Sequence, residues 1–244
     1  MEPPLQRSWG TRTCIVSREV FLLGKVQTTP WRRGNKMVVS AINCMMNRMK
    51  EKRTQEPSAD QKVEALIELI KAKAQNLFVT RQFQCAQAVL CSLNEGLRGR
   101  LRRDAAARLA SGLAEGLGGS GCLCGALSGG VLALGLFMGK DGRNLFNASG
   151  SSFSTALLHR EFTERFGSAC CKALSKTVKH DRKAHFEQCA ELTGAAAEIA
   201  SRIILESRPN LAKTADLDYL TTKDSIITGV LNRILPGIAG HCPV

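Results

Sequence analysis

The sequence predicts an all-α fold, a helical bundle with Gly- and Ser-rich connections. Its 244 residues include nine Phe, two Trp and one Tyr, while Ala, Leu, Gly, Lys and Arg are abundant. Few aromatic residues and few β-branched runs disfavour a sheet, whereas alanine and leucine favour helices that pack through small-residue contacts. A hydrophobic share of 44% over this length is enough for one main core with tails attached.

The order of apolar residues, caps and breakers predicts seven helices. Asp60, Asp104 and Ser168 stand where N-cap residues would begin the first, third and sixth of them. Pro209 ends the last, because proline cannot continue a helix. The expected helices cover about residues 60–74, 80–93, 104–116, 124–138, 156–166, a short stretch from 168, and 183–206.

The chain is expected to have three parts. Residues 1–55 form a basic, disordered N-terminal tail, residues 56–206 a cysteine-rich helical domain, and residues 207–244 an appended C-terminal segment with one further helix near 225–235. The tail has eleven Lys or Arg against three Glu, so it carries +8 of the net charge of +13. A basic tail is typical of a solvated segment, and basic and aromatic residues do not interleave as they do on surfaces that bind single strands. We therefore expect no specific nucleic-acid binding.

The uncharged stretch from Gly116 to Gly139 has about the length that spans a bilayer. Its first half is rich in Gly and Ser, so only Cys124 to Met138 forms a convincing helix, which is the length of a buried core helix. We expect no membrane span.

Ten cysteines are too many to be background in a chain of this size. The apolar stretch 16–26 is broken by Arg18, Glu19 and Lys25, so we expect no secretory signal and a reducing, cytoplasmic location. In such a compartment clustered thiols indicate metal binding or catalysis. No pair forms Cys-x-x-Cys, and no Cys-x-x-Cys-His is available for haem attachment. Seven cysteines fall in the helical region: Cys85, Cys91, Cys122, Cys124, Cys170, Cys171 and Cys189.

Two of these cysteines are placed to favour a thiolate. Cys124 begins a predicted helix and Cys171 lies in the first turn after Ser168. The positive end of a helix dipole favours S⁻ over SH, so we expect lowered pKa values there. Cys91 is interpreted as a packing residue, and His185, in a basic stretch, as a solvated side chain.

Four ordered blocks of the sequence contain cysteines of the helical region. The blocks are Phe83-Gln84-Cys85 to Val89, Ala110 to Gly129 with Cys124-Gly125-Ala126, Phe166-Gly167-Ser168 to Cys171-Lys172-Ala173-Leu174, and Cys189. Together they resemble the blocks of a redox-active protein family named for its C, GCAxxG, C, C cysteine pattern. The resemblance covers about residues 60–205, although the second block reads Cys-Gly-Ala where the family name has Gly-Cys-Ala.

By this resemblance Cys85, Cys124, Cys171 and Cys189 are the family's four cysteines. Related domains occur in split-Soret cytochromes, where an iron–sulfur centre lies beside haem. The resemblance therefore implies an iron–sulfur cluster held by these four cysteines, and electron transfer to an unidentified partner protein. The haem does not carry over, because its attachment motif is missing.

Two alternatives remain open at this point. The four cysteines could form reversible disulfides, with Cys122 or Cys170 as substitutes or resolving thiols. They could instead hold a structural zinc ion in a non-catalytic helical module. The glycine-rich run from Gly116 to Gly121 follows a helix rather than a strand, so it does not indicate a dinucleotide site. No Ser/His/Asp pattern indicates substrate chemistry, and the sequence leaves the oligomeric state open.

Overall fold

The computed structural model describes residues 43, 45, 46, 58–139 and 149–227. The predicted basic tail and most of the predicted helix near 225–235 lie outside these residues. The chain divides into two units, Met1–Glu56 and Pro57–Val244, and the helical domain lies in the second. Its helices are α2 (Ala59–Val79), α3 (Cys85–Gly96), α4 (Arg103–Ala110), the 3₁₀ turn η1 (Ser111–Leu113), α5 (Ala114–Leu117), α6 (Gly125–Met138), α7 (Ser149–Phe166), α8 (Cys171–Leu174), α9 (Arg182–Ser207), α10 (Leu211–Thr214) and α11 (Leu217–Thr221).

The predicted all-α class is confirmed. No β-strand occurs among the described residues, where the only β-type pairing is an isolated antiparallel bridge between Leu123 and Cys170. In the same part of the chain no helix combines the length and the hydrophobicity needed to cross a bilayer. The apolar helix α6 is 14 residues long.

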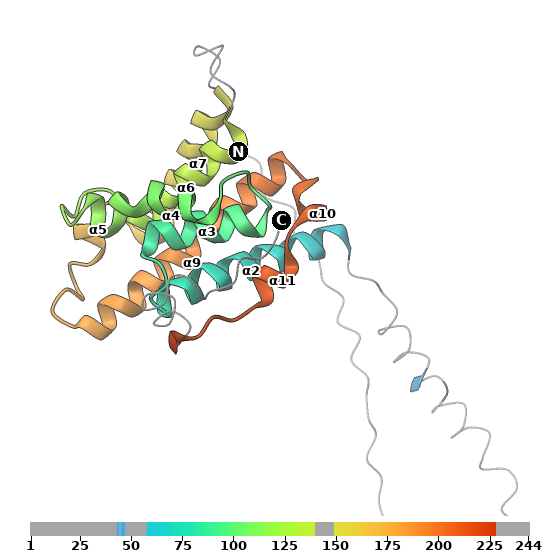
Figure 1. Cartoon of the computed structure of the whole chain (residues 1–244), viewed down its shortest axis with the longest axis horizontal. Helices are drawn as coiled ribbons and strands as arrows, with labels where there is room; N and C mark the ends of the chain where they lie inside the picture. The colour runs from blue at the N-terminus through green and yellow to red at the C-terminus, as the bar shows by residue number, and fades with distance from the viewer. Residues whose placement is uncertain (1–42, 44, 47–57, 140–148, 228–244) are drawn as a thin grey trace, which may run out of the picture. The chain divides into compact units, whose positions relative to one another are not determined.

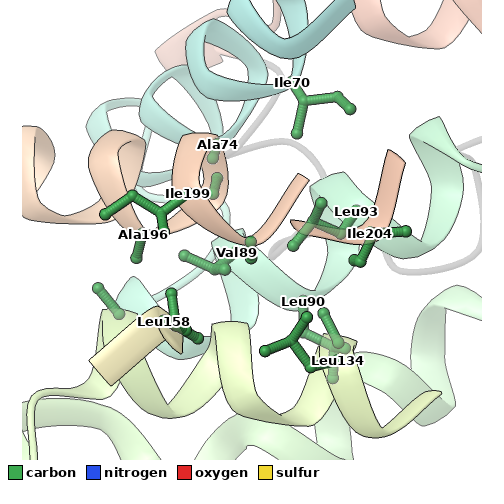
Figure 2. Close-up of a cluster of buried hydrophobic side chains, with 14 of the residues drawn as sticks. Ile70, Ala74, Val89, Leu90, Leu93, Leu134, Leu158, Ala196, Ile199 and Ile204 are labelled. Atoms are coloured by element: carbon green, nitrogen blue, oxygen red, sulfur yellow. The ribbon is translucent and has the colours of Figure 1, made fainter. Parts of the chain in front are cut away.

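Helix α3 is the centre of the core. It packs against α2, α4, α6 and α9, and α2 also lies along α9 (Figure 1). Its apolar face reads Val89, Leu90 and Leu93, all fully buried. Figure 2 shows these side chains among apolar residues of α2, α6, α7 and α9: Ile70, Ala74, Leu134, Leu158, Ala196, Ile199 and Ile204.

Small residues allow α6 and α3 to touch through their backbones. A Cβ atom built on Gly129 of α6 would lie 2.5 Å from the carbonyl oxygen of Ala86 in α3. No side chain fits there, so the glycine sets the separation of the two helices. This is the small-residue packing that the composition predicts.

The caps predicted for α2 and α4 are wrong. Ser58, not Asp60, begins α2, because its hydroxyl accepts from the Gln61 amide at 3.2 Å while the Gln61 side chain accepts from the Ser58 amide at 2.8 Å. This reciprocal pair satisfies two helix-end amides at once. Asp104 likewise lies inside the first turn of α4, and Arg102 is the N-cap. At both places the aspartate still favours the helix start through its charge.

The helix predicted over 104–116 breaks after Ala110. The chain continues through η1 and α5, where Glu115 (φ 54°) and Gly116 (φ 72°) adopt left-handed conformations. Gly116 needs this freedom, since a Cβ atom there would lie 2.9 Å from the Cβ of Cys171. The break therefore brings the glycine-rich segment against the cysteine that follows in α8.

The segment after α9 packs back on the domain. We call residues 211–224 the C-terminal clasp. The amide of Asp216 donates to the Gly96 carbonyl at 2.9 Å. Leu220 is buried against Gly96, where a Cβ atom would lie 2.8 Å from a Leu220 methyl group. The clasp therefore packs directly against the end of α3.

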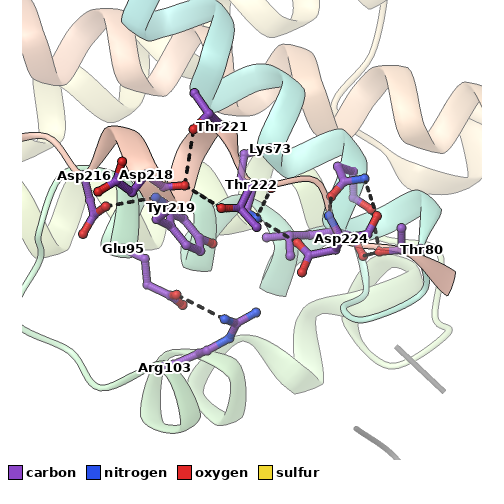
Figure 3. A network of polar contacts seen from close by, with 12 residues as sticks. Lys73, Thr80, Glu95, Arg103, Asp216, Asp218, Tyr219, Thr221, Thr222 and Asp224 are labelled. Atoms are coloured by element: carbon purple, nitrogen blue, oxygen red, sulfur yellow. Dashed lines mark hydrogen bonds and ion pairs between the residues drawn. The ribbon is translucent and has the colours of Figure 1, made fainter. Parts of the chain in front are cut away.

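A buried lysine fixes the end of the clasp (Figure 3). Lys73 of α2 is 3% exposed, and its Nζ lies 2.8 Å from Oδ2 of Asp224. The same ammonium donates to the Thr222 carbonyl at 2.8 Å and lies 4.5 Å from the ring centre of Tyr219. Asn76 adds hydrogen bonds to both the amide and the carbonyl of Asp224.

Candidate functional site: a pocket lined by four thiols

The four cysteines singled out in the sequence line one open pocket of about 1150 Å³, which we call the thiol pocket. Each comes from a different element. Cys85 is the first residue of α3, Cys124 the N-cap of α6, Cys171 the first residue of α8, and Cys189 lies in α9. The fold therefore collects one thiol from each of four separate segments.

A glycine brings α6 against the Cys85 thiol. A Cβ atom on Gly125 would lie 2.5 Å from Sγ of Cys85 and 2.7 Å from the carbonyl oxygen of Leu113. Any side chain at position 125 would displace the sulfur or the backbone. Gly125 directly follows Cys124, so this contact holds the starts of α3 and α6 at the same side of the pocket.

The isolated β-bridge likewise joins the segments that carry Cys124 and Cys171. The Cys124 amide donates to the Ala169 carbonyl at 2.7 Å, and the Cys171 amide donates to the Cys122 carbonyl at 2.7 Å. The segments that precede α6 and α8 are thereby joined side by side. The sequence predicts Ser168 as the cap of α8, but the structure shows that this prediction is wrong. The Ser168 hydroxyl accepts from the Cys170 amide at 3.0 Å, in the turn before the helix.

Burial raises the pKa of every thiol in the pocket. It raises the pKa of Cys124 to about 11 and that of Cys189 to about 12, and neighbouring thiols add to both effects. The pKa values of Cys85 and Cys171 are raised for the same first reason. The predicted lowering of the pKa at Cys124 and at Cys171 is therefore wrong. The nearby amides of α6 do lower the pKa of Cys124, but loss of water outweighs them.

The remaining cysteines of the described region lie elsewhere. Cys91 is fully buried in the core, as expected of a packing residue. Cys122 and Cys170 are exposed and do not line the pocket, and the Cys170 thiol donates to the Gly121 carbonyl at 3.2 Å. Cys14, Cys44 and Cys242 lie outside the described residues.

Several pocket residues could not be identified from the sequence. Phe78 and Phe186 stack with ring centres 5.0 Å apart, and both line the pocket. His185, interpreted from the sequence as a solvated side chain, is half-buried and lines it too. Sequence periodicity could not join these residues, because Phe78 lies in the last turn of α2 and Phe186 lies near the start of α9.

The donor set matches in kind what an iron–sulfur cluster requires, since such clusters are commonly held by four cysteine thiolates. Within residues 58–139 and 149–227, no three His, Cys, Asp or Glu side chains are close enough together to hold a metal ion. The four thiols share a pocket, and loading a cofactor would require them to approach one another.

The fold and the pocket define a cysteine-rich, all-α domain with its thiols gathered at one site. Residues 83–203, which contain all four pocket thiols, match the family described as "Putative redox-active protein (C_GCAxxG_C_C)". Through this segment the chain belongs to that family of redox-active proteins. No curated protein and no solved structure matches the chain.

Proposed function

We propose that this protein is an electron-transfer module whose cysteines Cys85, Cys124, Cys171 and Cys189 bind an iron–sulfur cluster. The observation that carries the proposal is that four sulfurs from four segments line a single pocket. Four thiolates from separated segments are a common ligand set for such clusters. The location that suits this function is a reducing one, such as the cytoplasm.

A bound cluster would supply the one-electron chemistry, and the chain supplies its surroundings. The raised pKa values keep the unliganded thiols neutral at pH 7. Each thiol must therefore lose its proton when it becomes a ligand, so loading becomes more favourable as pH rises. The amides of Ala126 and Leu127 lie near the Cys124 sulfur and stabilise its negative charge. Donors of this kind influence the reduction potential of a cluster.

Anaerobic purification of the full chain, followed by iron and sulfide analysis, tests the proposal. We expect a brown protein that contains both elements. Cys171→Ser should lose them, whereas Cys170→Ser should keep them, because Cys170 is the adjacent residue but does not line the pocket. If neither the purified nor the chemically reconstituted protein contained iron and sulfide, the proposal would be abandoned. Zinc without iron would instead indicate a structural zinc module.

A second candidate function is thiol–disulfide exchange. It is favoured by the exposed thiols of Cys122 and Cys170, which lie on the two segments joined by the β-bridge, next to Cys124 and Cys171. In such a step two thiols lose two protons and two electrons and form one disulfide, while a small-molecule disulfide is reduced to two thiols. Thiol labelling at a series of glutathione potentials tests it. Cysteines whose reactivity never changes with potential would contradict this function.

A further inference from the structure

Exposed cations are part of the lining of the thiol pocket. Arg81, Lys172, Arg182 and Lys183 all line it and all are exposed. We call these four residues the basic collar. Glu115 is the one carboxylate among the described residues that line the pocket. Anything that approaches the thiols from solvent therefore passes a surface of positive charge.

Two residues of the basic collar lie where their positive charge destabilises their own helix. Arg182 and Lys183 begin α9, a helix of 26 residues, whose first turn has no acidic residue. The N-terminus of a helix carries a partial positive charge, so cations there are unfavourable and acids are favourable. Asp181 caps the helix through the Lys183 and Ala184 amides. Local stability does not account for this arrangement of charge, and such conflicts are typical of functional sites.

Ion pairing removes little of the charge at this end of α9. Lys183 contacts Glu187 at 3.9 Å, and the two side chains are 86% and 66% exposed. A pair this long and this exposed contributes little free energy. Residues 172–183 contain five Lys or Arg and one Asp, so the neighbouring surface has the same sign.

Arg81 joins the basic collar to an aromatic surface. Its guanidinium lies 5.3 Å from the ring centre of Phe186, which stacks on Phe78. Arginine and aromatic side chains are enriched at the centres of protein interfaces. The pocket lining thus combines a pair of half-buried, stacked aromatic rings with exposed positive charge.

We propose that the basic collar docks an acidic electron-transfer protein over the thiol pocket. This inference rests on the proposed electron-transfer function and names the chemistry of its partner. A protein is favoured over a small anion because the four cations are exposed and come from three separate segments around an open mouth. Sites for small anions instead use a few convergent, enclosed groups. Exposed complementary charges steer protein encounters.

Two double substitutions test the proposal in the full chain. The collar variant, Arg182→Glu with Lys183→Glu, reverses the charge at the start of α9. The control variant, Arg208→Glu with Lys213→Glu, reverses the charge just beyond the other end of α9. Both change the net charge equally, and the 26 residues of α9, about 40 Å at about 1.5 Å per residue, separate Arg182 from Arg208. The probe is a plant-type ferredoxin, an acidic protein. Its association is measured by surface plasmon resonance at low and high salt.

We expect the collar variant to bind the probe about 10- to 100-fold more weakly at low salt, and the control variant to bind it as the natural chain does. Binding of the natural chain should weaken as salt increases. Equal weakening by both variants would show a response to total charge and overturn the proposal. So would equally tight binding of basic cytochrome c, or saturable binding of flavin mononucleotide at the collar without any binding of ferredoxin.

The same measurement on cluster-free and iron-loaded protein separates this proposal from the proposed function. If a chain that never takes up iron still binds ferredoxin through the collar, the docking proposal is supported and the iron–sulfur cluster is contradicted. If the iron-loaded chain binds no acidic electron carrier, the cluster is supported and the docking proposal is contradicted.

Discussion

The thiol pocket and the C-terminal clasp both bury polar groups, but opposite charges meet only in the clasp. There Asp224 lies against the ammonium of Lys73. Burial alone would raise the pKa of Asp224, yet Gln82 and Lys73 lower it overall. In the pocket, burial and neighbouring thiols act in the same direction and raise the pKa of Cys189. In the clasp a buried ammonium already has a carboxylate partner, whereas the pocket thiols would gain an opposite charge only from an added cation.

This difference separates stability from function. A buried ion pair with additional hydrogen bonds holds one conformation, since removing either partner leaves a buried charge. Buried neutral thiols cost little as long as they keep their protons, and they become strong ligands when a metal displaces those protons.

The largest effect is expected in the reactivity of Cys189. A rise of its pKa from 9.0 to about 12 lowers the reactive thiolate fraction at pH 8 by about 1000-fold, at tenfold for each pKa unit. Alkylation of cofactor-free protein with iodoacetamide, read for this cysteine by mass spectrometry, should be much slower than in the urea-unfolded chain. Equal rates in the two states would contradict the buried, neutral thiol.

The same pKa shift makes the stability of the protein depend on pH. A thiol whose pKa is raised by folding contributes stability that is present below its ordinary pKa and lost as pH rises toward the folded value. The free energy of unfolding of the cofactor-free protein should therefore fall between pH 9 and pH 12. Urea titrations at several pH values would measure this, and a constant free energy across that window would contradict it.

The next effect is expected in the clasp. Lys73→Met should lower the free energy of unfolding by about 3 kcal/mol, because it leaves the Asp224 carboxylate without its buried cation. Urea denaturation followed by circular dichroism measures the loss. The double variant Lys73→Met with Asp224→Asn removes both charges and should recover more than half of it. A double variant as unstable as the single one would show that packing, and not charge, holds the clasp.

The clasp also shows where sequence prediction ends. The all-α class and the helices that became α6 and α9 follow from hydrophobic spacing and from breakers such as Pro209, which are local signals. The Lys73–Asp224 pair joins positions 151 residues apart, and no local pattern indicates it. Asp60 and Asp104 resemble caps in the sequence because aspartate favours both the cap and the first turn of a helix.

The pocket was predicted only in part, for a related reason. The ordered family blocks selected Cys85, Cys124, Cys171 and Cys189, and the structure places all four at one pocket. Helix position alone predicted the wrong direction for the pKa of Cys124, because burial depends on neighbours that are distant in sequence. The basic collar lacked a sequence signal for the same reason, since its cations come from three separate segments.

A smaller effect is expected where α6 touches α3. Gly129→Ala would force a methyl group to within 2.5 Å of the Ala86 carbonyl oxygen unless the helices separate. We expect a loss of about 2 kcal/mol in the free energy of unfolding, typical of overpacking at a rigid contact. Because α6 begins beside Cys124, iron uptake should weaken as well. A variant with natural stability would show that the two helices can separate freely.

The smallest effect is expected in the same helix, on its solvent side. Gly135 is exposed within α6, and a Cβ atom there would meet nothing within 4 Å. Gly135→Ala removes the entropic cost of an interior helix glycine, so the free energy of unfolding should rise by about 0.8 kcal/mol. Iron content should not change, because no pocket residue is moved. Opposite signs at positions 129 and 135 would show that α6 needs glycine where it positions the thiol pocket and merely tolerates it elsewhere. A loss of stability at both positions would instead indicate that the whole helix is sensitive to added volume.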